Sequence, residues 1–270
     1  MTEVPLSNLK WQRVAASVAN HLRDRILTGE LQDGDLLPKE DVLRATYPVS
    51  KPSLREAMRI LETEGLISIR RGNMGGAVVH RPSASNVAYT LALVLRSQGT
   101  GTVAVAKALQ ECEPACAALC AERKDRKRAV LPKLRALQKE AVTNVSDLVQ
   151  ATNTSRRFHE AIVELCGNEP LKVIVGALEV LWSSHETDWA NHIRDPGLVP
   201  VEERQHALDI HAQLIDLIAA GDSVRVRELN AEHLQFVQHY PSKVAANGVL
   251  NRKDGAPIDP MLIRFELGDA

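Results

Sequence analysis

The sequence predicts a mainly α-helical protein with two domains, a winged helix-turn-helix followed by an all-helical bundle. Residues 10–81 contain three short helical patterns and then two β-prone runs around a glycine-rich tip. Residues 87–240 contain helical patterns only, separated by turn residues such as Gly167-Asn168. With 270 residues, the chain is long enough for each domain to bury its own core.

The first helix of the smaller domain is predicted over residues 11–27, because its apolar residues recur at the helical period. They are Val14, Val18, Leu22 and Ile26. Turn residues between Gly29 and Asp35 end this helix. Pro38 then opens a second helix over residues 39–46.

The third helix and a hairpin complete this domain. Ser50 can cap the helix, Pro52 suits its first turn, and Gly65 ends it. Its buried face would comprise Leu54, Ala57, Met58 and Leu61. The runs 66–69 and 77–79 predict the two strands of the hairpin. Three helices and a hairpin in this order suit a recognition helix laid in a DNA groove with a wing beside it.

The distribution of charge, rather than its total, indicates nucleic acid as a partner. The formal net charge is −1, so the chain as a whole is neither basic nor acidic. Against Glu56, Glu62 and Glu64, residues 44–71 hold the cations Arg44, Lys51, Arg55, Arg59, Arg70 and Arg71. A local basic face of this kind is the electrostatic footprint of DNA binding. A solvated helix face is the alternative for a charge run, and the wing beside the helix favours DNA.

The larger domain is predicted to be a helical bundle that follows a linker at residues 82–86. Its helices are expected over residues 87–98, 102–123, 129–142, 147–165, 170–192, 201–220 and 224–239. A bundle of this size can bury its own core. Residues 1–9 and 241–270 are expected to be tails, and the second, rich in Pro, Gly, Asn and Asp, is expected to be poorly ordered.

The cysteines and the apolar segments favour an ordinary interior and a cytoplasmic protein. Cys112, Cys116 and Cys120 recur every four residues and therefore lie on one stripe of one helix. There is no CxxC pair, so we favour core packing over a metal site or a redox switch. No apolar run reaches the roughly 18 residues that span a bilayer. Residues 1–8 lack the basic and apolar regions of a secretory signal.

These motifs resemble those of a known family of regulators. The smaller domain is similar to the DNA-binding domain of the GntR family through Gly29, Leu31, Gly34-Asp35, Leu37-Pro38, Glu40, Val49-Ser50, Leu54-Arg55-Glu56-Ala57, Leu61, Glu64-Gly65-Leu66 and Gly75-Gly76. The larger domain is similar to the FCD effector domain of the FadR-type branch through Glu113-Pro114, Phe158-His159, Gly167-Asn168, Leu171, His211, Gly221-Asp222 and His233-Leu234. The resemblance covers residues 11–239.

The resemblance implies that the start of the third helix and the wing tip read double-stranded DNA. The residues at these positions are Lys39, Ser50, Lys51, Ser53, Arg55, Arg59, Arg70, Arg71 and Gly72. Arginine can form two hydrogen bonds with guanine, whereas Lys51, where the family usually has arginine, is a point donor. Asp41 replaces another usual arginine, and Lys39 replaces a small residue. We therefore expect an operator that differs from the commonest family sequence.

The resemblance also implies a metal site. Many FCD domains hold a divalent ion with an aspartate and three histidines, and His159, His211 and His233 match the three histidines. The aspartate position, four residues before the first histidine, is Ser155, and serine is a poor ligand for zinc-like ions. One interpretation is a three-histidine site for one Zn or Ni ion per chain, with an open position for an oxygen ligand. The other is that the histidines line a polar pocket without an ion.

The effector pocket is expected around Leu109, Ser155, Trp182 and His185. Many family members place an arginine at the position of Leu109 to bind a carboxylate. Its replacement leaves two effector classes open, a small carboxylate and a larger or more apolar metabolite. Trp182 and Trp189 could line such a pocket, although core packing is the commoner role of a tryptophan.

Together, these observations predict a homodimeric, ligand-responsive transcriptional regulator that binds an inverted-repeat operator and no membrane. The resemblance to the family implies that it is a repressor. Effector binding in the bundle would shift the population between DNA-competent and DNA-incompetent forms. A metal-dependent enzyme that uses the histidines is the alternative. It lacks a nucleophile elbow or a phosphate loop, and it would leave the DNA-binding domain unexplained. An RNA-binding module would need aromatic platforms, and after Trp11 the only aromatic residue of the small domain is Tyr47.

Overall fold

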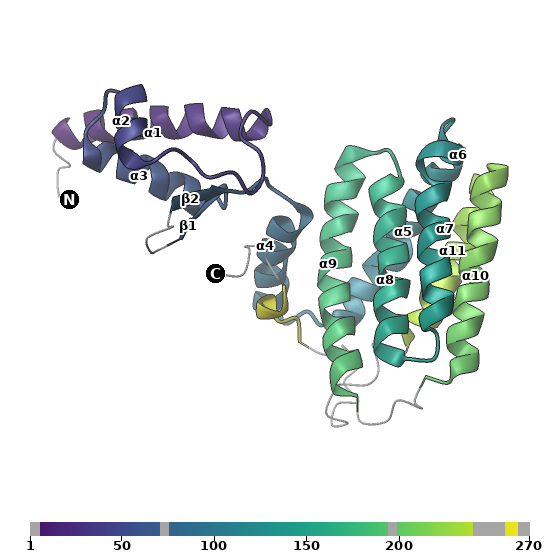
Figure 1. Cartoon of the computed structure of the whole chain (residues 1–270). Coiled ribbons are helices and arrows are strands. Elements are labelled where there is room, and N and C mark those ends of the chain that lie inside the picture. Colours follow the sequence, from purple (N-terminus) through teal and green to yellow (C-terminus); the bar gives the residue numbers. More distant parts are fainter. Residues whose placement is uncertain (1–5, 71–75, 194–198, 240–256, 264–270) are drawn as a thin grey trace. The chain divides into compact units, whose positions relative to one another are not determined.

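The computed structural model describes residues 6–70, 76–193, 199–239 and 257–263. The chain separates into two compact units, which we call the head, residues 1–83, and the bundle, residues 84–264. Helices make up most of both units (Figure 1), and the described residues contain one two-stranded sheet, so the mainly α-helical fold class is confirmed. No helix in the described part of the chain has the length and the apolar character that crossing a membrane requires.

The head consists of three helices and a hairpin, as predicted. The helices are α1, Leu6–Leu27, α2, Glu40–Thr46, and α3, Lys51–Thr63, and the strands are β1, Ile67–Arg70, and β2, Gly76–Val79. The strands run antiparallel, with Ile67 opposite Val79 and Arg70 opposite Gly76. The tip between them, residues 71–75, lies outside the described residues.

Most residues of the apolar stripes predicted for the head helices form its core, but Val14 is 41% exposed and lies outside it. Leu22 and Ile26 of α1 belong to the same buried cluster as Leu54 and Leu61 of α3, and all four side chains are almost completely excluded from solvent. Burying a leucine or isoleucine side chain contributes about 1.5–3 kcal/mol to folding. This core fixes α3 against α1 and so leaves the opposite face of α3 exposed.

The bundle is built from longer helices. They are α4, Ala84–Ser97, α5, Thr102–Glu122, α6, Arg126–Ala129, α7, Leu131–Asn144, α8, Leu148–Leu165, α9, Glu169–His192, α10, Val201–Ala220, and α11, Ser223–Val237, and a 3₁₀ turn, η2, spans Pro260–Leu262. In Figure 1, α9, α8, α7 and α10 lie side by side in that order, and each contacts the next. α5 contacts α8, α9, α10 and α11, so residues on its buried faces meet side chains from four helices.

Three details differ from the expected organisation. α1 begins at Leu6, inside residues 1–9, which were expected to be a tail. α4 begins at Ala84, within the segment expected to be a linker, because Ala84 lies four and eight residues before the buried Ala88 and Ala92 and shares their helix stripe. The single-turn helix α6 is absent from the sequence-based prediction, because four residues, RKRA, are too few to display a helical period.

Part of the segment expected to be a poorly ordered tail is packed on the bundle. Within residues 257–263, Ile258 and Ile263 are 5% and 4% exposed and belong to the hydrophobic core. The expectation is therefore wrong for these seven residues, because two isoleucines separated by a turn can be buried without forming a periodic pattern. The rest of residues 241–270 lies outside the described part.

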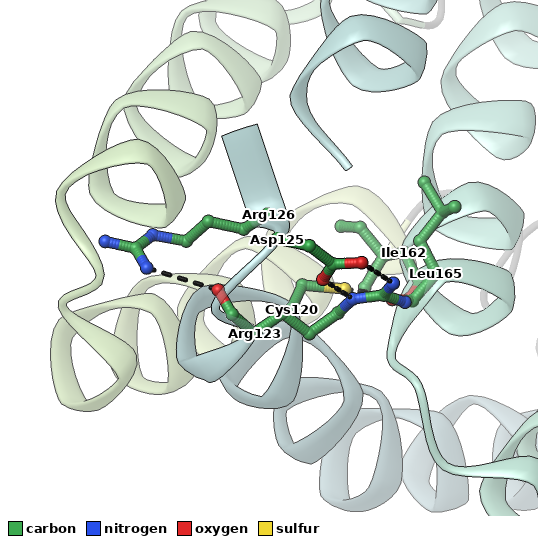
Figure 2. A network of polar contacts seen from close by, with 6 residues as sticks. All are labelled: Cys120, Arg123, Asp125, Arg126, Ile162 and Leu165. Carbon is green, nitrogen blue, oxygen red and sulfur yellow. Dashed lines mark hydrogen bonds and ion pairs between the residues drawn. The ribbon is translucent and has the colours of Figure 1, made fainter. Parts of the chain in front are cut away.

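Two arginines, Arg123 before α6 and Arg126 at its start, bind the carbonyl ends of neighbouring helices (Figure 2). Arg123 donates from Nη1 to the Leu165 carbonyl, the last of α8, at 2.9 Å, and its Nε pairs with Asp125 at 2.9 Å. Arg126 donates to the Arg123 carbonyl at 3.2 Å, and also to the Ala219 carbonyl at the end of α10 at 3.4 Å. The last carbonyls of a helix have no partner within it, so these side chains satisfy groups that would otherwise rely on water.

The cysteines occupy the interior, in agreement with the core role predicted for them. Cys116 and Cys120 are fully buried, and Cys112 on the same stripe is partly buried. The Cys120 thiol donates to the Ile162 carbonyl at 3.3 Å (Figure 2). Burial raises the pKa of Cys120 to about 12, so its thiol stays protonated and unreactive at neutral pH.

Candidate functional sites

The exposed start of α3 carries two of the predicted DNA-reading cations. The side chains of Lys51 and Arg55 are 51% and 68% exposed. Both pair with Glu40 of α2, Lys51 at 3.1 Å and Arg55 at 3.9 Å. Glu40 therefore gathers the two cations at one place on the surface of the head, where they would otherwise repel one another.

Of the other predicted DNA-reading residues, most are exposed and one is buried. Lys39, Ser50, Arg59 and Arg70 are exposed. Ser53 is only 4% exposed; its amide donates to the Ser50 Oγ at 3.3 Å, and the two hydroxyls lie 2.9 Å apart. Ser53 thus supports the N-terminus of α3 from inside the head, unlike the surface contact expected of it. The two wing-tip residues, Arg71 and Gly72, lie outside the described residues.

Three histidines meet in the interior of the bundle. His159 of α8, His211 of α10 and His233 of α11 are all buried, and one ligand atom of each lies within 4.8 Å of the others. The Nε2 atoms of His211 and His233 are 2.9 Å apart. We call these three residues the histidine cluster. The structure therefore brings together all three residues for which the sequence implied a common site.

A buried carboxylate orients the first histidine. Glu113 of α5 accepts hydrogen bonds from His159 Nδ1 at 2.8 Å and from Asn230 Nδ2 at 3.1 Å. Burial alone would raise the pKa of Glu113, but the charge and the hydrogen bond of His159 lower it overall. Because Nδ1 of His159 is hydrogen-bonded to Glu113, its Nε2 is the atom that faces the other histidines. This buried atom has no hydrogen-bond partner among the described residues.

The other two histidines are held in the neutral form. Burial, together with the neighbouring histidines, keeps the pKa of both His211 and His233 well below 6.5. The ring of His211 also stacks on Phe158, with centroids 4.0 Å apart. Neutral imidazole is the form that binds metal ions. Three buried nitrogens around one point, one of them lacking a protein partner, therefore fit a divalent ion.

A small chamber borders the histidine cluster. It is lined by His159, Ser155, Trp182, Glu179 and Glu186, among others. Ser155 brings a hydroxyl where an aspartate would bring a charge. Burial, and then the negative charge of Glu113, raise the pKa of Glu179 well above its usual value, which favours the protonated form of this carboxyl. Burial also raises the pKa of Glu186 to about 7.

Two of the four expected effector-pocket residues, Ser155 and Trp182, line this chamber. His185 packs edge-on against Trp182, with ring centroids 5.7 Å apart, and with it lines a different cavity beside residues 257–263. Leu109 is fully buried in the hydrophobic core, so it acts there as a packing residue.

Glu113, Asn230 and Glu179 are the site residues that sequence reasoning missed. Glu113 had a signal, because it lies four residues after Leu109 and three before Cys116 and therefore shares their buried helix stripe. A carboxylate on an apolar stripe needs a buried partner. Which partner it has depends on how α5 packs against α8, and the sequence does not contain that information in any local pattern.

Comparison with known proteins matches each unit to a family model. Residues 14–79, in the head, match the model of bacterial regulatory proteins of the gntR family. Residues 105–236, in the bundle, match the FCD domain.

Curated proteins and solved structures agree with these matches. The chain is 25% identical to the HTH-type transcriptional regulator YcbG of Bacillus subtilis over 88% of this chain and 94% of that protein. It is 26% identical to the HTH-type transcriptional repressor NanR of Cronobacter sakazakii over 84% of each chain. The structure of a GntR protein of Streptococcus agalactiae matches with a TM-score of 0.59 and 20% identity, over 84% of this chain and 99% of that one, which supports the fold alone.

Proposed function

This chain belongs to the GntR family of bacterial regulatory proteins, with an FCD domain as its second part, and on that premise we propose that it represses transcription until a metabolite binds in its bundle. Its relatives are transcriptional regulators rather than enzymes, so the metal-dependent enzyme is not retained. That NanR is named a repressor supports repression here. The chain would act on DNA in the cytoplasm.

One observation carries the proposal, namely that exposed cations on α3 and a buried histidine cluster lie in separate units. The head exposes Lys51 and Arg55 at the start of α3, where a helix in the major groove meets base edges. The bundle buries the histidine cluster beside a chamber. We assign DNA reading to residues 10–81 and sensing and dimerisation to residues 87–240. The chain would exist in DNA-competent and DNA-incompetent forms. The effector would bind one form better than the other and so shift the balance between them.

A homodimer suits this arrangement. A single α3 reads a short half-site, and a two-fold symmetric dimer places a second α3 on the matching half of an inverted repeat. Both small carboxylates and larger apolar metabolites are candidate effectors, because Leu109 takes the place of the family's arginine.

Selection from a random double-stranded DNA library would test this function. We expect the purified full chain to enrich an inverted repeat, and sedimentation analysis to find a dimer. A variant with Lys51→Glu and Arg55→Glu is the matched control, because both side chains are exposed and their reversal should spare the fold while abolishing enrichment. Equal enrichment by the variant, or no enriched sequence with the native chain, would contradict the proposal.

We further propose that the histidine cluster holds one divalent ion per chain, Zn or Ni by ligand type. His159, His211 and His233 would supply three nitrogens, with Glu113 fixing the ring of His159. Such an ion would supply a positive charge and an open position that anchor an oxygen atom of the effector. Ser155 leaves this position without a carboxylate, so the ion should be held more weakly than by a site with aspartate.

Elemental analysis and melting curves with added metal would test the ion. His211→Ala should abolish metal uptake and the accompanying rise in melting temperature, because a ligand bound only by the folded state stabilises it. Ser155→Asp should tighten uptake and make it more resistant to a chelator. His192→Ala is the control, since His192 is exposed and outside the cluster. If the native chain and Ser155→Asp both take up no metal, the histidines line a pocket without an ion.

A further inference from the structure

A third space, a cavity of about 80 Å³, lies among α7, α8, α9, α10 and α11. Its walls include the apolar residues Ala141, Val145, Leu148, Ala151, Ala207 and Leu208. Three of these six are alanines on facing helices, and their small side chains leave the space open. A cavity of roughly 150 Å³ holds benzene, so this one has room for an aliphatic group of roughly three or four carbons without any side-chain movement.

This cavity adjoins the chamber beside the histidine cluster. Ser155, Glu186 and Val237 line both spaces. One molecule can therefore place an apolar part in the cavity and reach the chamber with the other end. One of the three shared residues, Ser155, occupies the position where the histidine cluster lacks a carboxylate.

The cavity also contains two buried hydrogen-bond donors without acceptors. Trp189 is 3% exposed, and its Nε1 has no partner among the described residues. The same holds for the buried Nε of Arg204, although its Nη1 donates to the Val145 carbonyl at 2.7 Å and so fixes the guanidinium. Buried donors are normally paired in folded proteins, so two unpaired ones lining one cavity indicate a ligand that brings an acceptor.

We propose that this cavity binds the aliphatic part of the effector, a short-chain molecule with an acceptor oxygen that Trp189 and Arg204 bind. The inference rests on the proposed sensing role of the bundle, and it adds an apolar subsite that needs no ion. A carboxylate and a carbonyl share the acceptor chemistry. Arg204 favours the carboxylate, and the acidic groups Glu186 and Glu203, which also line the cavity, disfavour it.

Calorimetric titration of the metal-free full chain would test the subsite. The probes are straight-chain carboxylates from acetate to octanoate and methyl ketones of the same lengths. Affinity should rise about three- to fourfold for each added methylene, as apolar surface is buried, and fall once the chain exceeds the cavity. The more tightly bound series identifies the oxygen. Affinity that does not depend on chain length, or no binding by either series, would overturn the inference.

Two variants locate the binding. Ala151→Phe fills the cavity and should weaken the best probe at least tenfold, whereas Ala136→Phe, on the exposed face of α7, should leave its affinity unchanged. Trp189→Phe keeps the aromatic ring but removes the donor. It should weaken the probe severalfold, and the smaller ring should cost some stability without unfolding the unliganded chain. Because Trp189→Phe keeps the fold, equal affinity in this variant and in the native chain would overturn the inference even if Ala151→Phe misfolds.

The same titrations separate this inference from the function on which it rests. If no probe binds but the chain still selects an inverted repeat, the subsite is wrong and the regulator remains. If the chain selects no DNA sequence, the regulatory function fails irrespective of the titrations.

Discussion

The Nε2 atoms of His211 and His233 lie 2.9 Å apart inside the bundle, although the two residues come from different helices. At this distance one ring donates a hydrogen and the other accepts it, and two neutral rings meet that requirement. Two protonated rings would each place a hydrogen and a charge at the same point. The pair therefore resists protonation, in keeping with the lowered pKa of both rings.

The first prediction is that the bundle loses stability in acid. Because the pKa of His211 and His233 is lowered on folding from 6.5, the unfolded chain binds more protons than the folded chain below that pH. The free energy of unfolding should therefore fall as the pH drops below about 6.5. His159 has the opposite effect on stability. Burial lowers its pKa, but Glu113 raises it more, so the pKa of His159 is raised on folding.

Melting curves between pH 5 and 8 with a chelator present would measure this effect. His233→Phe should reduce the loss of stability between pH 7 and 5, because only one histidine with a lowered pKa, His211, then remains. His192→Phe is the comparison, since His192 is exposed and lies outside the histidine cluster, and it should not reproduce the effect of His233→Phe. A profile that is identical in His233→Phe and the native chain would contradict the assignment.

The second prediction concerns the reading helix. Arg55→Ala should weaken binding to the selected operator by about 1–3 kcal/mol and relax discrimination at one base pair, if Arg55 bonds a guanine edge. The exposure of its side chain means that the fold should be unaffected. Gel-shift titrations on the operator and on single-base variants would measure both effects.

Arg70→Ala provides the comparison, because Arg70 is exposed and is the last residue of β1 in the wing. A phosphate contact should lower affinity evenly across sequences and reduce the slope of log affinity against log salt by about 1. If both variants lose affinity evenly for all sequences, Arg55 is a phosphate contact and the specificity lies elsewhere.

The third prediction is that Arg123 stabilises the bundle as a helix cap. Arg123→Met keeps the length of the side chain but removes the hydrogen bond to the Leu165 carbonyl and the pair with Asp125. We expect a loss of about 1–3 kcal/mol in the free energy of unfolding, because a helix end then lacks its partner. Lys124→Met, at an exposed neighbouring position, should change it by less than about 0.5 kcal/mol. Equal losses in denaturant titrations would show that charge, not capping, matters.

The fourth prediction concerns the packed C-terminal segment. Ile263→Ala should lower the free energy of unfolding by about 2–5 kcal/mol, as expected for truncating an isoleucine that is 4% exposed. Met261→Ala, two residues away and 82% exposed, should have almost no effect. Chemical denaturation would measure both, and a neutral result for Ile263→Ala would mean that the segment does not contribute to the core in solution.

The helices were predictable because each buries one stripe of residues that recur at the helical period. Their ends were predictable where the side chain that forms the cap is local, as with Asn168, which accepts from the Leu171 amide at 3.2 Å. Gly221 also marks an end, since its φ of 84° suits glycine best. The segment around Ile258 and Ile263 was missed because its contacts are to residues far away in the sequence.

The residues of the candidate sites were predictable only in part. The convergence of the histidine cluster came from family resemblance and not from spacing, since His159 and His233 are on different helices. The partnership of Glu113 with His159, and the cavity left by Ala151 and Ala207, depend on how helices pack against one another. Such packing is decided by all the contacting side chains at once, so no short sequence pattern reports it.

The contacts of residues 257–263 also set an order of events during synthesis of the chain. Pro257 forms a β-bridge with Gly101, and Asp259 pairs with Arg96 at the end of α4, 163 positions earlier. While the ribosome is still making the bundle, α4 lacks these partners. The described contacts of the head core, in contrast, lie between Val18 and Val79. We therefore expect the nascent chain to complete its DNA-reading part well before its sensing part, which needs residues 257–263 to complete these contacts.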